Sequence, residues 1–250
     1  MSYTNQHRGN SEFVEDQRKF FDRLITHDWD TYVNPYWDRT RRIEVQEVMR
    51  FAPSVQTVLD IGCGCGYHDV LLAEIPSITQ VIGVDYSTKS IEQANKHYPH
   101  PKVKRFVADI FRSQELCKKF GVFDLVVSFQ VIEHLSDPRG FMSICASLSS
   151  SKGYVAVVTP NRHNLSNRIR RLRGHPPVMI DPMHFCEYSV EELEEIGRVV
   201  GLVAAGHFGH SSQLTLRGIK ILSHTSSFAL GVGRLFPCVA SMIGVAFRHL

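Results

Sequence analysis

Short apolar runs alternate with longer amphipathic segments through the middle of the chain. The apolar runs occupy residues 58–61, 81–84, 103–107, 123–129 and 154–158. Segments with helical spacing follow at residues 68–74, 89–97, 112–120, 138–148 and 190–200. Short apolar strands that alternate with helices indicate an α/β fold with a parallel sheet covered on both faces. Right-handed crossovers then bring the carboxyl ends of the strands, and any ligand, to one edge of the sheet.

Three parts of the chain depart from this alternation. Residues 1–12 are polar, and we expect a disordered tail there. Over 13–51, apolar and aromatic residues recur at helical spacing and are interrupted at Asn34-Pro35, which predicts two helices. Residues 161–188 contain five arginines and three prolines, and this segment is too long for an ordinary connection. We therefore expect a tail (1–12), an N-terminal helical cover (13–51) and one domain (52–250) with a lid or binding insertion at about 161–188.

Length and composition are those of an ordinary globular protein. The 250 residues fit one α/β domain, and 43% apolar residues suffice for a sizeable core. A net charge of +3 is too small to argue for nucleic-acid binding, so no nucleic-acid partner is expected. The polar N-terminus does not resemble a signal peptide, and the six cysteines form no CxxC pair. We therefore expect a cytoplasmic protein with reduced, mostly buried thiols.

A glycine-rich turn follows the first apolar run. It reads Asp-Ile-Gly-Cys-Gly-Cys-Gly over residues 60–66. Its candidate cofactor-binding residues are Asp60, Gly62, Cys63, Gly64 and Gly66. Glycine allows positive φ and lets the backbone approach a ligand closely. The dinucleotide fingerprint needs a glycine where this chain has Tyr67, and an acid before the loop suits a cationic ligand better than a pyrophosphate. Alone, the loop is equally consistent with a tight turn.

Acidic residues also close the next two apolar runs. Asp85 stands where a carboxylate can accept hydrogen bonds from both ribose hydroxyls. Asp109 follows the third run and can accept from an adenine amino group. Taken singly, each acid is explained as well by a helix N-cap or a solvated loop position. Three acids at the carboxyl ends of three successive strands, Asp60 included, favour a ligand site.

Four segments resemble the successive motifs of class I S-adenosylmethionine-dependent methyltransferases. They are Val-Leu-Asp-Ile-Gly-Cys-Gly-Cys-Gly (58–66), Val-Asp-Tyr-Ser (84–87), Ala-Asp-Ile (108–110) and Phe-Asp-Leu-Val-Val-Ser (123–128). The resemblance covers about residues 55–160. It implies a Rossmann-like methyltransferase fold, with a mostly parallel seven-stranded sheet and helices on both faces. It also implies strands at 202–208 and 241–248, with residues 210–240 as an insertion in the terminal hairpin.

The resemblance implies S-adenosylmethionine as the cofactor and gives roles to the residues at the strand ends. Asp60 and the glycine loop would hold the methionyl part, and Gln130 would line the cofactor near it. Ribose would bind Asp85, with Tyr86 beside it, and Asp109 and Ile110 would frame adenine. The N-terminal helices resemble the cofactor cover of the family, and either Arg41 or Arg42 would pair with the methionyl carboxylate.

The segment Gln-Val-Ile-Glu-His-Leu at 130–135 resembles the ubiquinone-biosynthesis O-methyltransferase branch. That branch has a metal-binding glutamate at the position of Gln130, and because this chain lacks it, no metal is predicted. His134, beside Glu133, is a candidate general base, and His184 is a second. Structural roles for these side chains remain open, since methyl transfer from an activated sulfonium needs little more than proximity and alignment.

The leading hypothesis is a methyltransferase that acts on a small or lipid-linked acceptor, with oxygen favoured over nitrogen or carbon. A non-catalytic binding module on the same fold is one alternative. An NAD-dependent oxidoreductase is another, but Asp60 and the spacing of the glycines count against it.

Basic and apolar residues coincide towards the end of the chain. Residues 162–173 carry five arginines and no acid, and no acid follows Glu195. The apolar stretch 228–250 is interrupted by Arg234 and Pro237, so we do not expect it to span a bilayer. Two interpretations remain open: a solvated lid beside a buried last strand, or a face that rests peripherally on an anionic membrane.

Overall fold

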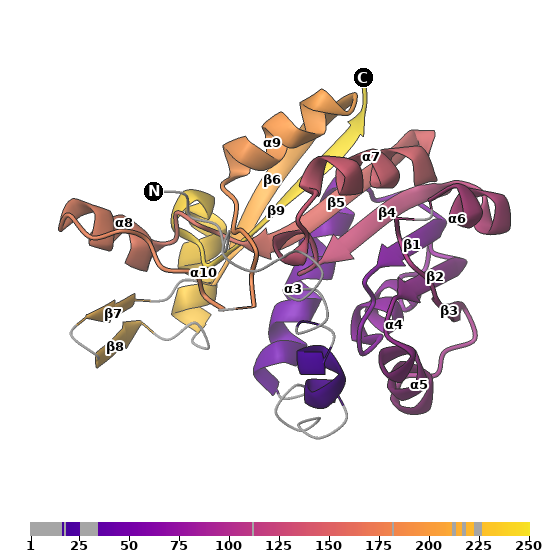
Figure 1. The fold of residues 1–250 in the computed structure, drawn as a ribbon, viewed down its shortest axis with the longest axis horizontal. Coiled ribbons are helices and arrows are strands. Elements are labelled where there is room, and N and C mark those ends of the chain that lie inside the picture. The colour runs from indigo at the N-terminus through magenta and orange to yellow at the C-terminus, as the bar shows by residue number, and fades with distance from the viewer. Residues whose placement is uncertain are drawn as a thin grey trace.

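Seven strands form one sheet in the order β3-β2-β1-β4-β5-β9-β6 (Figure 1). Their bounds are β1 Thr57–Ile61, β2 Gln80–Asp85, β3 Val103–Val107, β4 Phe123–Phe129, β5 Ser149–Pro160, β6 Leu202–His210 and β9 Met242–His249. Strand β9 pairs antiparallel with β5 and β6, and the other pairs are parallel. The predicted mostly parallel, seven-stranded sheet is therefore confirmed.

This computed structural model describes residues 17, 19–25, 35–111, 113–181, 183–211, 214–216, 219–222 and 227–250. The expected disordered tail at 1–12 lies outside them. Residue 17 and residues 19–25 are helical. The helices that follow are α3 Pro35–Phe51, α4 Tyr67–Ala73, α5 Thr88–His97, α6 Ser113–Phe120, α7 Pro138–Leu148, α8 Leu165–Leu172, α9 Val190–Val199 and α10 Ser227–Leu235, with short 3-10 turns η1 Ile132–His134 and η2 Pro237–Val239.

Apolar side chains divide between two cores, one on each face of the sheet. Along β4, Val126 enters the core formed with α7 and α9, whereas Leu125 and Val127 enter the core formed with α3 and α4. This alternation is the two-residue period of a strand buried on both faces. The helices begin where the sequence provides caps. Ser189, for example, caps α9 in a complete capping box with Glu192.

Two insertions extend the sheet edge formed by β5, β9 and β6. The first carries α8, and the second carries the two-stranded ribbon of β7 (Leu214–Leu216) and β8 (Ile219–Leu222), followed by α10 and η2. Nε of Arg168 on α8 donates to the carbonyl of Cys238 at 3.1 Å, so the two insertions touch. Among the described residues, no helix is long and apolar enough to cross a membrane.

Candidate active site

The glycine loop joins β1 to α4 and can be built only from small residues. Gly62, Gly64 and Gly66 have φ of 77°, 51° and 75°. A Cβ on Gly62 would lie 2.3 Å from Cγ2 of Val131. Both the backbone conformation and the available space therefore require glycine at position 62. Cys63 and Cys65 are buried free thiols in the positions between the glycines.

Asp85 ties the glycine loop to the start of α5. Its Oδ2 accepts from the backbone N–H of Gly64 at 3.0 Å, and its Oδ1 accepts from that of Ser87 at 2.9 Å. Burial raises the pKa of Asp85, while these two backbone hydrogen bonds lower it and leave a net upward shift. The side chain lies at the carboxyl end of β2, at the edge where the sequence predicts the ribose.

The other residues predicted to contact the nucleoside are more exposed to solvent than Asp85. Tyr86 is 46% exposed, and Asp109 is exposed at the end of β3. Oδ1 of Asp109 accepts from the backbone N–H of Phe111 at 3.0 Å, and Ile110 is half-buried between them. The structure thus places Asp85, Tyr86, Asp109 and Ile110 on two neighbouring strand ends.

Asp60 is buried near the end of β1, directly before the glycine loop. The side chain is fully buried, and burial together with the neighbouring Asp69 carboxylate raises its pKa well above the ordinary value. Asp69 in turn accepts from Nε of Arg105 at 2.6 Å, and Arg105 also donates to the carbonyl of Gly66 at 3.0 Å. The contact of Asp60 with a methionyl group stays a prediction.

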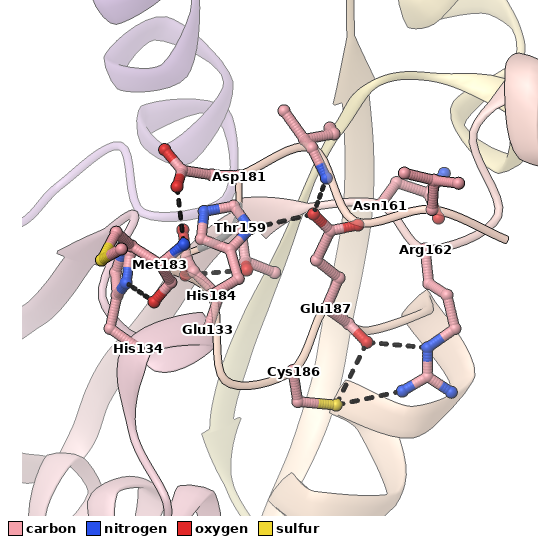
Figure 2. Close-up of polar contacts among 12 residues, drawn as sticks. Glu133, His134, Thr159, Asn161, Arg162, Asp181, Met183, His184, Cys186 and Glu187 are labelled. Carbon is pink, nitrogen blue, oxygen red and sulfur yellow. Dashed lines mark hydrogen bonds and ion pairs between the residues drawn. The ribbon is translucent and has the colours of Figure 1, made fainter. Parts of the chain in front are cut away.

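Two histidines fifty positions apart in the sequence meet beyond the end of β4 (Figure 2). The rings of His134 and His184 have centroids 4.9 Å apart and are tilted by 73°. Nδ1 of His134 lies 3.1 Å from the carbonyl of Met183. Because a carbonyl oxygen only accepts, we assign the proton to Nδ1, and Nε2 keeps its lone pair. Burial, followed by the charge of His184, lowers the pKa of His134 to about 4.

Two buried carboxylates lie beside this pair of histidines, and one of them, Glu187, contacts His184 directly. Nδ1 of His184 lies 2.9 Å from Oε1 of Glu187; burial lowers the pKa of His184, but Glu187 and then Glu133 raise it above its ordinary value. Oε2 of Glu133 accepts from the hydroxyl of Thr159 at 2.9 Å. Burial raises the pKa of Glu133 to about 7, although His184 and the hydrogen bond from Thr159 oppose the shift.

The backbone of η1 fixes the segment that carries His184. The carbonyl of Glu133 accepts from the backbone N–H groups of Phe185 and Cys186 at 2.7 and 3.1 Å. This explains how residues so far apart in the sequence come together at one strand end. The three side chains predicted as catalytic, Glu133, His134 and His184, also have ligand atoms within 4.8 Å of one another, a spacing that a metal ion could use. The donors are two imidazoles and one carboxylate, a set that suits zinc better than magnesium.

The N-terminal helix crosses the same edge. Nε2 of Gln17 donates to the carbonyls of Met183 and His134 at 2.8 and 3.2 Å. Further along, the Asp22 carboxylate accepts from the hydroxyl of Ser87 at 2.7 Å. The helical segment therefore reaches from the start of α5 to the histidine pair, over the carboxyl ends of the strands.

Comparison with known proteins agrees with this geometry. The profile of the methyltransferase domain family matches residues 36–205. The chain belongs to this family. The predicted resemblance to class I S-adenosylmethionine-dependent methyltransferases is thereby confirmed. Because the match begins inside α3, it includes part of the predicted helical cover, and our division of the chain stays a prediction.

Two curated proteins illustrate which methyltransferases the chain is similar to. A probable S-adenosylmethionine-dependent methyltransferase of Mycobacterium tuberculosis is 34% identical over 169 residues, which are 67% of this chain and 56% of the relative. A ubiquinone biosynthesis O-methyltransferase of Caulobacter vibrioides is 35% identical over 106 residues, 42% of this chain and 41% of that protein. The matched part of the chain thus covers about half the length of these two curated relatives.

A solved structure shows the same fold over the whole chain. The S-adenosylmethionine-dependent methyltransferase of Anabaena variabilis superimposes with a TM-score of 0.69 at 13% identity, covering 100% of this chain and 99% of that one. The predicted Rossmann-like methyltransferase fold is therefore confirmed.

Several polar residues of this methyltransferase site were missed by the sequence reasoning. Glu44 and His210 are buried, His68 is half-buried, and the three form one hydrogen-bonded cluster beside Gln130. Helical spacing over α3 signals an amphipathic helix, and charged residues on such a helix are expected to face solvent. No local sequence pattern predicts that the face of α3 that carries Glu44 is turned towards the sheet.

Proposed function

We propose that this chain binds S-adenosylmethionine at the carboxyl edge of β1, β2, β3 and β4 and transfers its methyl group to an acceptor oxygen. The observation that carries the proposal is the meeting of His134, His184 and Glu133 next to Gln130 and the glycine loop. The name of the Caulobacter relative supports oxygen as the acceptor atom. The acceptor is a small or lipid-linked molecule.

The cofactor would lie with its ribose on Asp85 and its adenine between Asp109 and Ile110. Its methionyl part would face Gln130 and the backbone of the loop from Gly62 to Gly66. Because glycine has no side chain, the backbone of this loop can approach such a ligand closely. The N-terminal helix through Gln17 and Asp22 would cover it.

Of the two candidate arginines, Arg41 is the better partner for the methionyl carboxylate. Arg41 is 5% exposed, and its guanidinium lies 5.6 Å from the ring centre of Tyr67, the residue after Gly66. Arg42 is largely exposed and already pairs with Asp38 at 3.1 Å. A buried guanidinium beside the loop would gain most from a carboxylate.

His134 is the proposed general base. The acceptor oxygen attacks the methyl carbon, and the carbon–sulfur bond breaks with its electron pair remaining on sulfur, which leaves S-adenosylhomocysteine. The proton of the acceptor hydroxyl passes to Nε2 of His134, whose lone pair is kept available because Nδ1 donates to Met183. His184, held by Glu187, would orient the ring of His134 through their edge-to-face contact. Glu133, whose carboxylate lies within 4.8 Å of the histidine nitrogens, would stabilise the charge that His134 gains.

The test is transfer of a labelled methyl group from S-adenosylmethionine to fractionated cell extract, with water-soluble and lipid fractions assayed separately. His134→Ala should reduce turnover by roughly 10²- to 10⁴-fold and leave the affinity for S-adenosylhomocysteine intact. His207→Ala, an exposed histidine that pairs with Glu194, is the control. Full activity of His134→Ala and of His184→Ala would contradict a base and leave alignment as the catalytic device.

A lipid-linked acceptor is favoured by what the two insertions expose. Where the structure describes their side chains, the large apolar ones in solvent are Leu172, Val178 and Ile180 in the first insertion, and Phe228, Leu235 and Phe236 in the second. We call these six residues the insertion surface. Leu172 is 87% exposed directly after Arg170 and Arg171. Exposed apolar residues among arginines suit an anionic membrane surface.

A further inference from the structure

Helix α3 carries a buried polar stripe on the face turned towards the sheet. Thr40, Arg41, Glu44 and Glu47 are all at most 5% exposed, and their spacing of three or four residues puts them on one side of the helix. Burying a carboxylate is costly unless it is paired. The contacts of Glu44 and Glu47 therefore indicate which parts of the protein these buried residues connect.

Glu44 joins three elements at the carboxyl edge of the sheet. Its Oε2 lies 2.8 Å from Nε2 of His68, in the first turn of α4, and its Oε1 lies 3.1 Å from Nε2 of His210, at the end of β6. Oε1 also accepts from the amide of Gln130 at 3.2 Å. Burial raises the pKa of Glu44, but its contacts with His210 and His68 outweigh burial and lower it to about 2. The carboxylate is therefore ionised at neutral pH.

Gln130 is held in a conformation that a non-glycine residue rarely adopts. Its φ is 60°, in the left-handed region, directly after β4 ends. The backbone N–H of Gln130 donates to the carbonyl of Val158 at 2.8 Å, and its side chain is anchored on Glu44. The next residue, Val131, fills the space over Gly62. Strained residues of this kind persist only where their surroundings fix them, and they gather at functional sites.

We propose that Glu44 is a positioning residue for the methionyl end of the cofactor site. Its ionised carboxylate, oriented by His68 and His210, keeps Gln130 in the left-handed conformation and thereby sets the wall between the glycine loop and His134. The proposal rests on the proposed S-adenosylmethionine site. It gives helix α3, through Glu44, a part in forming that site.

Calorimetric titration with S-adenosylhomocysteine tests this role in Glu44→Gln. We expect affinity to fall about tenfold, the scale of one lost hydrogen bond to a charged group. Binding of 5′-methylthioadenosine, which lacks the amino-acid end, should change less than twofold. Glu47→Gln is the matched control: this residue is equally buried one turn further on, but its partners are Arg50 and Arg234, away from Gln130. Both variants should melt at a lower temperature, and only Glu44→Gln should lose affinity.

Gln130→Gly separates positioning from a general loss of stability. Glycine adopts the left-handed conformation without strain and removes the link to Glu44. In this background, Glu44→Gln should weaken S-adenosylhomocysteine binding less than twofold further. Additive losses, equal loss in Glu47→Gln, or unchanged affinity in Glu44→Gln would each overturn the proposal.

A crystal structure of Glu44→Gln gives a result that does not depend on ligand binding. We expect Gln130 to leave the left-handed region. Retention of its φ near 60° would overturn the positioning role even if the cofactor binds as proposed. Failure of the unaltered protein to bind S-adenosylhomocysteine would instead contradict the proposed function, and the conformation of Gln130 in the variant would still decide the role of Glu44.

Discussion

At the scale of single residues, the site is defined by buried groups whose charge depends on their neighbours. Glu44 and Glu133 are both fully enclosed carboxylates, yet their pKa values move in opposite directions, to about 2 and about 7. Glu44 has two histidine partners, whereas the described partner of the Glu133 side chain is one hydroxyl. Partners, rather than depth of burial, therefore decide which of the two is ionised at neutral pH.

The raised pKa of Glu133 predicts a pH-dependent stability. Between pH 4.5 and about 7, the folded protein holds a proton on Glu133 that the unfolded chain releases, so the free energy of unfolding should fall as pH rises through this range. The loss should approach about 3 kcal/mol. Glu133→Gln, which mimics the protonated acid, should lose less. Urea unfolding at pH 5 and pH 8 measures this, and identical pH dependence in both proteins would contradict it.

The choice of Arg41 over Arg42 predicts a selective loss of binding. Arg41→Ala should weaken S-adenosylhomocysteine binding by about 1.5–3 kcal/mol, the scale for a charged hydrogen bond. Binding of 5′-methylthioadenosine should not change, because that ligand has no carboxylate. Arg42→Ala is the control and should leave both affinities nearly unaltered. Equal losses for both ligands in Arg41→Ala would show that the variant disturbs the site as a whole.

At the scale of elements, the glycine loop works only if its neighbours leave room for it. Gly62 must be glycine both for its φ of 77° and for the side chain of Val131 above it, whereas Gly121 has a similar φ of 74° and open space around it. The two positions therefore separate backbone strain from crowding.

Gly62→Ala should consequently destabilise the protein more than Gly121→Ala. Gly121→Ala should cost about 1 kcal/mol, from strain alone. Gly62→Ala should cost roughly 1–3 kcal/mol more, because a methyl group is forced against Val131. Adding Val131→Ala to Gly62→Ala should recover part of that difference. Chemical denaturation of the four proteins tests this, and equal losses at the two glycines would contradict the crowding.

The elements also show what a sequence can and cannot predict. Strands β1 to β4 lie close to their predicted bounds because apolar residues dominate β1, β2 and β4 and begin and end β3. Helix α7 lies at its predicted bounds because it is an amphipathic segment capped by Asp137. Strand β5 begins at Ser149, five residues before the apolar run, because Ser149 pairs with Phe123 ahead of a shift in the register. The residues at 149–152 are polar and therefore give no apolar signal of a strand. The sequence identifies His134 and His184 as candidates but does not predict that they are neighbours. Their proximity depends on backbone hydrogen bonds from Phe185 and Cys186 to the carbonyl of Glu133.

At the scale of the whole molecule, the nucleotide end and the insertions lie on opposite sides of the histidine pair. Strands β1, β2 and β3 carry the predicted cofactor residues, and α8, α10 and the β7–β8 ribbon lie at the other end of the sheet (Figure 1). An acceptor that arrives from the insertions would reach His134 from the side away from Asp109. This arrangement fits an acceptor delivered from a surface.

Membrane contact through the insertion surface can be measured directly. The protein should sediment with vesicles containing anionic lipid at low salt, and Arg170→Gln with Arg171→Gln should weaken this by about 2 kcal/mol, since each basic residue contributes about 1 kcal/mol. Lys118→Gln with Lys119→Gln, on α6 at the opposite end of the sheet, is the control with equal charge removed (Figure 1). Protein that stays in the supernatant at low ionic strength would exclude this contact and favour a soluble acceptor.

The central claim is that the carboxyl edge of the sheet binds S-adenosylmethionine through Asp85 and the glycine loop. Calorimetric titration of the intact chain with S-adenosylhomocysteine and with NAD tests it most directly, in the unaltered protein and in Asp85→Ala. We expect binding of S-adenosylhomocysteine but not of NAD, and a loss of about 1.5–3 kcal/mol of binding free energy in Asp85→Ala. Preference for NAD, or unchanged affinity in a folded Asp85→Ala variant, would contradict it.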